Sequence, residues 1–182
     1  MSRLQARLAG TFYLLTIVVG MCAAFTTSKP LSSAGNLIGT AFYVVVTVLL
    51  YLILKPVNPA LSLIAALISL AGCTVGVLEA LHRSPFPFNG IVIFGFYCLL
   101  LGYLIFRSGF LPRWLGPLVA LAGVGWLTFF WPPFARHLGI VPIITGLVGE
   151  GSLTVCLLLA PTKPQTVSNQ LGGEPAQLRP RL

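Results

Sequence analysis

Apolar residues dominate this chain in long runs, and short polar or proline-rich breaks separate one run from the next. A helix that crosses a bilayer needs about 20 consecutive, mostly apolar residues. Six stretches meet that requirement approximately, at residues 8–27, 34–54, 60–81, 88–106, 114–131 and 138–160. The pattern therefore predicts an all-α integral membrane bundle of six transmembrane helices with short loops, within residues 1–162.

Proline positions support these boundaries. A proline in a helix interior removes a backbone hydrogen bond that lipid cannot replace. None of the 14 prolines falls in the middle of an expected span. Pro117 and Pro142 fall in expected first turns, where the missing N–H costs little.

Composition excludes an ordinary soluble domain. Hydrophobic residues make up 57% of the chain and charged residues only 8%, whereas soluble domains carry about 25% charged residues. So few charges cannot cover the water-exposed surface of a soluble protein of this size, so a lipid bilayer is the expected partner. Although the net charge is +8, the basic residues stand at the ends of apolar runs, so nucleic acid is not an expected partner.

Lysine and arginine positions predict an orientation. One side of the bundle receives Arg3, Arg7, Lys55, Arg107, Arg113, Lys163, Arg179 and Arg181, and the other receives Lys29, Arg83 and Arg136. Because the more basic side faces the cytoplasm, both termini are expected there. Residues 163–182 are polar and are expected to form a disordered cytoplasmic tail.

The N-terminus permits a second interpretation. Arg3 and Arg7, an apolar core and the small residues at 22–24 also resemble a cleaved secretory signal peptide. Retention as the first span is favoured, because the apolar run is long enough to cross the bilayer.

The most informative polar residue is Glu150, near the middle of the last span. An ionised carboxylate at the bilayer centre costs on the order of 3 kcal/mol, so Glu150 is expected to face the bundle interior. One interpretation is a proton-relay or substrate-binding acid. The other is a protonated carboxyl that hydrogen-bonds a neighbouring helix, with Gly149 and Gly151 allowing close packing.

A second group of candidate binding residues is expected at the outer helix ends. Glu79, His82 and Arg83 have i, i+3, i+4 spacing and would share one face of the third helix. Arg136 and His137 would open the sixth helix at the same level, completing one polar pocket if the two helices touch. His82 and His137 would then be candidate haem or metal ligands. The alternative is interfacial snorkelling with one local salt bridge.

Recognisable catalytic chemistry is missing from the sequence. It contains no G-x-S-x-G, H-E-x-x-H or Walker motif. The chain has no Asp and only two Glu outside the tail, too few carboxylates for a di-iron or multi-carboxylate site from one chain. An enzyme is therefore not expected, and no catalytic residue, resident cofactor or metal is predicted.

Four segments together carry a family resemblance. They are CLLLGYLIFRSGFLPRWLGPLVALAGVGWL at 98–127, LVGEGSLTVCLLL at 147–159, YLILKPVN at 51–58 and RLAGTFYLLTIVVG at 7–20. They closely resemble a bacterial polytopic membrane family catalogued as domain of unknown function 4386, over nearly the whole chain short of the tail. The resemblance implies a compact helical bundle in the cell (inner) membrane without an assigned activity. It adds interest to Glu150, Arg107 and Arg113, which match the family motif. Members often carry His where this chain has Tyr97, which can still donate a hydrogen bond.

The segment from Arg107 to Arg113 also has a direct physical explanation. Arg107 ends a helix, where a cation suits the negative end of the helix dipole. Pro112 forces a stop, and Arg113 with Trp114 pins the next helix at the interface. A structural hinge explains these features, and recognition of an anionic head group is a secondary interpretation.

Three functions remain open from the sequence. The first is a small transport-like or permeation protein with Glu150 as its buried acid. The second is a non-catalytic membrane subunit or scaffold, a homo-oligomer or a partner subunit, held by small-residue faces such as Gly35-x3-Gly39 and Gly72-x3-Gly76. The third is a haem- or metal-binding electron carrier that uses His82 and His137.

Overall fold

A computed structural model describes residues 3–83, 85 and 89–159. The helices are α1 (Arg3–Phe25), α2 (Lys29–Leu54), α3 (Pro59–Ala80), α4 (Ile91–Arg107), α5 (Leu115–Leu127), the 3-10 turn η1 (Thr128–Phe130), α6 (Pro132–Leu138) and α7 (Val141–Leu159). The described residues contain no strand, and the predicted all-α class is confirmed. The expected disordered tail at 163–182 lies outside the described residues.

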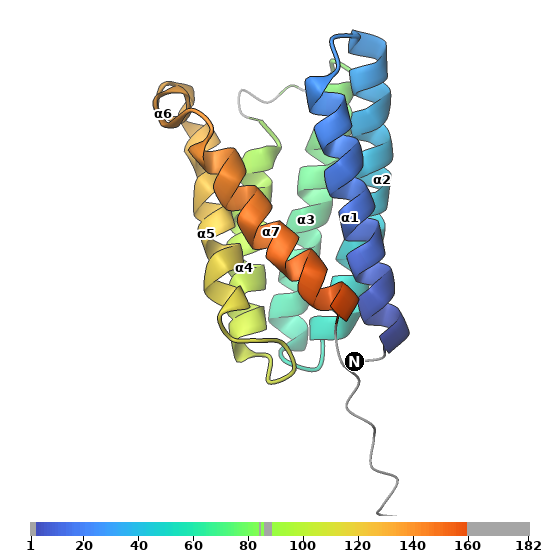
Figure 1. Ribbon diagram of the computed structural model, residues 1–182, viewed down its shortest axis with the longest axis vertical. Coiled ribbons are helices and arrows are strands. Elements are labelled where there is room, and N and C mark those ends of the chain that lie inside the picture. Colours follow the sequence, from blue (N-terminus) through green and yellow to red (C-terminus); the bar gives the residue numbers. More distant parts are fainter. Residues whose placement is uncertain (1–2, 84, 86–88, 160–182) are drawn as a thin grey trace, which may run out of the picture.

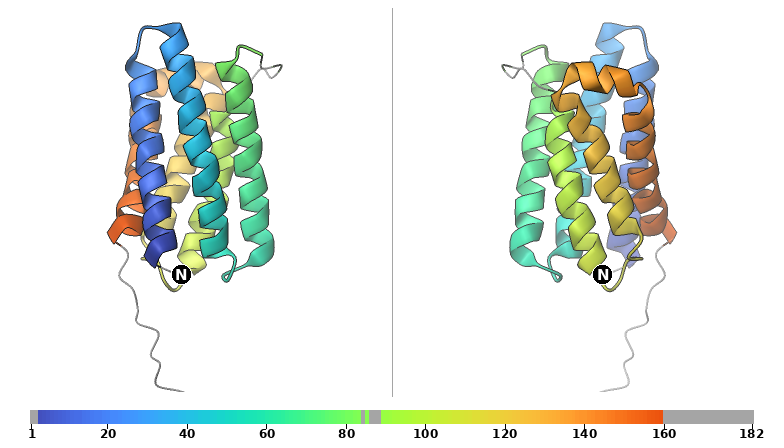
Figure 2. Two further views of the ribbon diagram at one scale, coloured as in Figure 1. Left: turned by 90° about the vertical axis from the view of Figure 1, so that its right-hand side faces the viewer. Right: turned by 90° about the vertical axis from the view of Figure 1, so that its left-hand side faces the viewer.

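The longer helices run alternately up and down and close into a ring (Figure 1, Figure 2). Around the ring the packing order is α1, α2, α3, α4, α5 and α7, and α7 packs back against α1. Short connections favour antiparallel neighbours of this kind. One consequence matters for the site: α3 and α7 stand on opposite sides of the ring, each between two other helices.

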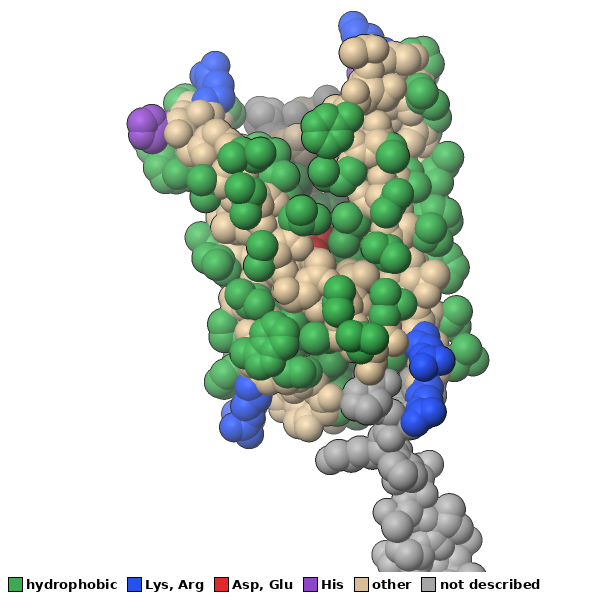
Figure 3. All heavy atoms as spheres, viewed as in Figure 1, with side chains coloured by type: hydrophobic (Ala, Val, Ile, Leu, Met, Phe, Trp, Pro, Cys, Tyr) green, Lys and Arg blue, Asp and Glu red, His purple; other side chains and the backbone are tan. Residues whose placement is uncertain are grey.

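The outer surface is that of a membrane-embedded protein. Among the described residues, α1, α2, α3 and α7 are long and apolar enough to cross a membrane, and two shorter apolar helices accompany them. Large apolar side chains such as Val18, Leu67 and Val124 remain about half exposed. In Figure 3 apolar side chains cover the middle of the molecule while Lys and Arg lie at its two ends. A water-soluble monomer does not leave so extensive an apolar surface uncovered.

Backbone-to-backbone packing holds α4, α5 and α7 together. A Cβ added to Gly102 of α4 would lie 2.6 Å from the carbonyl oxygen of Gly116 on α5. One added to Gly149 of α7 would lie 2.5 Å from the carbonyl oxygen of Leu118 on α5. Close approach of this kind stabilises helix pairs in lipid through van der Waals contacts, because the hydrophobic effect does not drive helices together there.

The predicted glycine motifs also serve contacts inside the ring. A Cβ on Gly35 of α2 would lie 2.8 Å from the Cβ of Ala23 on α1. One on Gly72 of α3 would lie 3.1 Å from the ring of Phe94 on α4. These two glycines therefore explain packing between neighbouring helices without a second copy of the chain.

Candidate functional site

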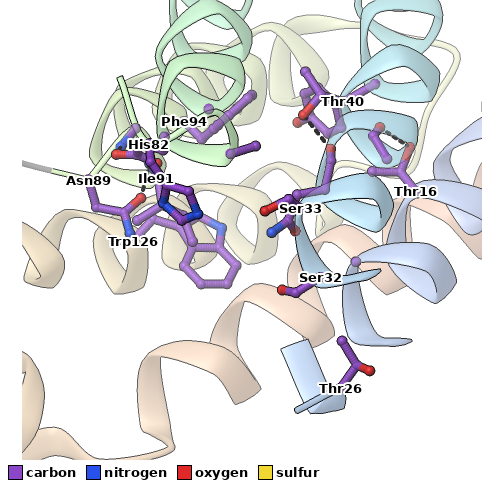
Figure 4. A pocket seen from close by; sticks show the side chains of 18 of the residues that line it. Thr16, Thr26, Ser32, Ser33, Thr40, His82, Asn89, Ile91, Phe94 and Trp126 are labelled. Atoms are coloured by element: carbon purple, nitrogen blue, oxygen red, sulfur yellow. Dashed lines mark hydrogen bonds between the residues drawn. The ribbon is translucent and has the colours of Figure 1, made fainter. Parts of the chain in front are cut away.

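A cavity of about 650 Å³ lies inside one half of the bundle. Its lining comes mainly from α1, α2, α3 and the start of α4, with Trp126 from α5 and Glu150 from α7. Uncharged polar side chains are frequent in the lining and include Thr16, Ser32, Ser33, Asn36, Thr40 and Asn89. Figure 4 shows His82, Asn89 and Trp126 on one side, with Ser32, Ser33 and Thr40 across from them. Figure 3 shows a hollow between α1 and α7 with an acidic side chain inside it.

Glu150 is held by an indole. The Trp126 Nε1 donates a hydrogen bond of 2.7 Å to Glu150 Oε1. Gly146, one turn before Glu150 on α7, provides the room, because a Cβ there would overlap the Trp126 ring. An indole N–H is a donor only and needs an acceptor when buried, and a carboxyl oxygen accepts in either protonation state. Glycine and glutamate at i, i+4 on α7 therefore build this contact.

A group of tyrosines from three helices begins beside the same carboxyl. Tyr13 of α1 lies beside Glu150, and its hydroxyl is 3.4 Å from that of Tyr43 on α2. Tyr43 contacts Tyr97 of α4 edge-on, with ring centroids 6.2 Å apart. Phenols are ordinarily neutral at pH 7, so Glu150 is the acidic member of this group.

Glu79 has a structural partner at the cavity wall. Its Oε1 accepts a hydrogen bond of 2.8 Å from the backbone N–H of Gly90, which directly precedes α4. The carboxyl therefore ties the end of α3 to the start of α4. Glu79, His82 and Glu150 line the same cavity.

The expectation that Glu79, His82 and Arg83 share a helical face is wrong. Helix α3 ends at Ala80, and His82 adopts a left-handed conformation with φ of 55°. The Arg83 N–H donates to the Leu78 carbonyl over 2.8 Å, and the His82 N–H donates to the Glu79 carbonyl over 2.9 Å. This pair of bonds is the Schellman helix stop, which turns the chain away from the helix axis.

The expectation that Arg136 and His137 open the last span is also wrong. Both are exposed on α6, and Gly139, with φ of 57°, separates that short helix from α7. Neither residue, nor Arg83, lines the cavity. Because α3 and α7 are not neighbours in the ring, the single pocket of five groups does not form. No group of three or more His, Cys, Asp or Glu among the described residues is placed to hold a metal ion.

The remaining candidates lie elsewhere. Arg107 and Arg113 are exposed at the end of the bundle away from the cavity. Between them Ser108 is buried, and its hydroxyl donates to the Ile105 carbonyl over 2.8 Å. Tyr97 is buried in the core, and its hydroxyl has no hydrogen-bond partner among the described residues.

Sequence reasoning missed Trp126, Gly146 and Tyr13. The sequence did contain one signal for the contact between Trp126 and Glu150. A tryptophan late in an apolar span must pair its indole N–H when it is buried. Only three acidic residues exist in the chain, so Glu150 was an available acceptor.

The family match covers the part of the chain that carries this contact. Residues 80–160 match the family described as Domain of unknown function (DUF4386). The resemblance predicted from the sequence is confirmed for this segment, which contains Trp126 and Glu150. The resembling segments at 7–20 and 51–58 lie outside the match, which is therefore shorter than expected.

The chain is also similar to an uncharacterized relative over part of its length. The chain is 32% identical over 90 residues to an uncharacterized protein of Archaeoglobus fulgidus. The alignment covers 46% of this chain and 56% of the relative, so the chain spans about half the length of the protein it matches. No solved structure matches the chain.

Proposed function

We propose that this chain is a small transport-like protein of the cell membrane, and that Glu150 is the acid on which its transport depends. The observation that carries the proposal is a polar cavity of about 650 Å³ with a carboxyl held at its inner end. This volume is typical of small-molecule sites, which occupy about 300–1,000 Å³. Ionisable groups inside a membrane are costly and usually serve a pathway.

Six transmembrane helices and cytoplasmic termini are part of the proposal. The shorter helix α4 has 17 residues, which extend about 25 Å at the rise of an α-helix and nearly match the hydrocarbon core. It packs between α3 and α5 as a full member of the ring. Arg3, Lys55 and Arg107 lie at one end and Lys29 at the other. With the more basic end inside, the cavity opens toward the outside.

A small organic cation is the solute class that suits this cavity. Glu150 supplies the negative charge, and the rings of Tyr43, Phe94 and Trp126 line the same space. Aromatic faces attract cations, most strongly where water is excluded. Lys29 also lines the cavity, but it is the first residue of α2 and lies at the mouth. Its positive charge is therefore separated from Glu150, which is near the middle of α7.

Uptake into proteoliposomes tests the proposal. The probe is radiolabelled tetramethylammonium, a permanent cation that does not cross lipid unaided. We expect the wild-type protein to take it up at a rate that depends on pH, and Glu150→Gln to lose both uptake and pH dependence while remaining monodisperse. Ser152→Ala is the matched control, because it lies on the same helix outside the cavity lining. Unchanged, pH-dependent uptake by Glu150→Gln would overturn the role of the acid.

The two other functions have no such observation behind them. His82 lines the cavity and His137 does not, so a shared haem or metal is not favoured. Gly35 and Gly72 contact neighbouring helices of the same chain, so these two glycines do not favour the scaffold function.

A further inference from the structure

Two carboxylates line the large cavity, and the proposed function uses only one of them. Glu150 lies at the inner end, where its Oε1 accepts from the Trp126 indole. Glu79 lines the same space from the last turn of α3. The whole chain has only three acidic residues, so the presence of two of them in one cavity suggests a use for both.

The hydrogen bond from the Gly90 N–H does not account for the charge of Glu79. That N–H is neutral, and a side-chain amide or hydroxyl oxygen can accept from such a donor as well as a carboxylate can. A carboxylate has two oxygens with about four acceptor positions, and this contact uses Oε1 alone. Because Glu79 is only partly buried, a solute in the cavity can reach it.

Helix register gives the separation of the two carboxylates. Glu79 binds the N–H of Gly90, directly before α4. Gly95, five residues further along the chain, packs against α5, and a Cβ added there would lie 2.8 Å from Leu127 Cγ. Trp126, next to Leu127 in sequence, holds the other carboxylate. Five helical residues extend about 8 Å, so the two acids stand about one third of a helix apart along the bundle.

The cavity wall between these two levels is apolar on α4. Ile91 and Phe94 both line the cavity there, and Figure 4 shows them on the same side. Gly76 of α3 also lines the cavity, and a Cβ added to it would meet only Thr40 Oγ1 within 4 Å, at 3.9 Å. The space beside Gly76 is therefore open. An open passage with apolar walls suits a chain of methylene groups.

The basic lining residues lie outside this passage. Among the described residues that line the cavity, they are Lys29 and His82. Lys29 precedes Thr40 by eleven residues on α2, which places it about 16 Å nearer the mouth. His82 follows Glu79 in the turn beyond the end of α3. Neither residue therefore stands between the two carboxylates.

We propose that the large cavity takes a linear aliphatic dication, with one cationic nitrogen beside Glu150 and the other beside Glu79. This assignment rests on the proposed function, because it makes the transported solute a double rather than a single cation. Two positive charges balance the two carboxylates, and the connecting methylenes contact Ile91 and Phe94. An extended chain advances about 1.2 Å per bond, so four to six methylenes place the nitrogens about 6–8 Å apart, which fits between the two acids.

Binding to the purified protein tests the assignment without transport. The probes are radiolabelled bis(trimethylammonium)pentane, a permanent dication, and pentyltrimethylammonium, which has the same chain and a single charge. Equilibrium dialysis in detergent micelles compares their affinities. We expect the wild-type protein to bind the dication about tenfold more tightly, because its second charge meets a second carboxylate. Equal affinities for the two probes would overturn the proposal.

The length of the chain gives a second readout. Bis(trimethylammonium)ethane carries the same two charges only about 4 Å apart, too close together to reach both carboxylates. We expect it to bind no more tightly than pentyltrimethylammonium. An affinity as high as that of bis(trimethylammonium)pentane would show that net charge alone attracts the probes, and would overturn the two-point contact.

Glu79→Gln identifies the second carboxylate. The amide oxygen of glutamine can still accept from the Gly90 N–H, so the variant keeps the contact at the start of α4. We expect it to bind the dication and pentyltrimethylammonium equally, and Glu150→Gln to bind both more weakly. Ser152→Ala, outside the cavity lining, is expected to keep the tenfold preference. A tenfold preference that persists in Glu79→Gln would contradict the role of Glu79.

Binding and uptake together separate failure of this assignment from failure of the proposed function. If tetramethylammonium uptake depends on Glu150 but the wild-type protein binds both pentyl probes equally, the dication assignment is wrong and the transport proposal stands. If the dication binds with its tenfold preference but tetramethylammonium is not taken up, the transport proposal fails and the two-carboxylate binding site stands.

Discussion

The indole nitrogen of Trp126 lies 2.7 Å from a carboxyl oxygen of Glu150 and joins α5 to α7. The contact has a positional consequence, because it holds the acid at the inner end of the cavity. One turn further on, the Thr154 hydroxyl donates to the backbone carbonyl of Glu150 over 2.8 Å. The carboxyl itself is oriented by the indole before any solute arrives.

Removing the indole donor tests that orientation. Trp126→Phe keeps an aromatic ring but loses the N–H, so we expect a loss of about 1 kcal/mol in the free energy of unfolding. Trp114→Phe, at an exposed tryptophan before α5, is expected to change little. Denaturation in mixed detergent micelles measures both. Equal stabilities for the two variants would contradict a structural role for the hydrogen bond.

Filling the space beside the indole gives an independent test. Gly146→Ala would place a methyl group inside the Trp126 ring, and overpacking of this kind typically costs about 1–3 kcal/mol. Gly151→Ala, on the same helix with nothing within 4 Å, is expected to be neutral or slightly stabilising because alanine favours helix. Thermal unfolding in detergent compares them. A tolerated Gly146→Ala would mean that the indole can leave Glu150 without cost.

The hydrogen bond between Glu79 and the Gly90 N–H predicts a local change in hydrogen exchange. Glu79→Gln retains an oxygen that can accept from the Gly90 N–H, whereas Glu79→Leu removes the acceptor. We expect faster hydrogen exchange at the Gly90 amide in Glu79→Leu and little change in Glu79→Gln, with about 1 kcal/mol of stability separating the variants. Similar exchange in both would show that the carboxyl does not hold the start of α4.

The proposed orientation can be read by chemical labelling. After the four native cysteines are replaced, a single cysteine is placed at Arg136 or at Arg113, which lie at opposite ends of the bundle. We expect a membrane-impermeant thiol reagent to label Arg136→Cys in intact cells, and Arg113→Cys only after permeabilisation. The reverse pattern would place the cavity on the cytoplasmic side.

The helices were predictable because hydropathy and proline act locally. Each expected stretch covers most of one of the longer helices. Pro59 and Pro142 stand in first turns, as helix geometry favours. The end of α3 at Ala80 lies one residue from the expected end at 81. The left-handed turn after it was not predictable in this way, because no glycine stands at position 82 and a histidine makes the turn.

The site was harder to predict because ring closure creates it. Trp126 and Glu150 are 24 residues apart, and only the packing of α5 against α7 brings them together. Helix α6 was missed for a local reason, since its first residue, Pro132, lies between two expected spans and proline begins helices as well as ending them. Glu150 itself was identifiable from the local sequence, because an ionisable residue inside an apolar run is costly whichever residues it contacts in the fold.

The contact between α1 and α7 gives the ring unequal stiffness at its two ends. A Cβ on Gly10 would lie 2.8 Å from the Leu158 side chain, so the seam is tight near the start of α1. Toward the other end of α1 the two helices diverge (Figure 1). Glycine contacts hold α4, α5 and α7 together. A tilt of α1 about the tight contact at Gly10 would therefore open or close the large cavity at the other end of this seam, as in hinge motions of packed helices.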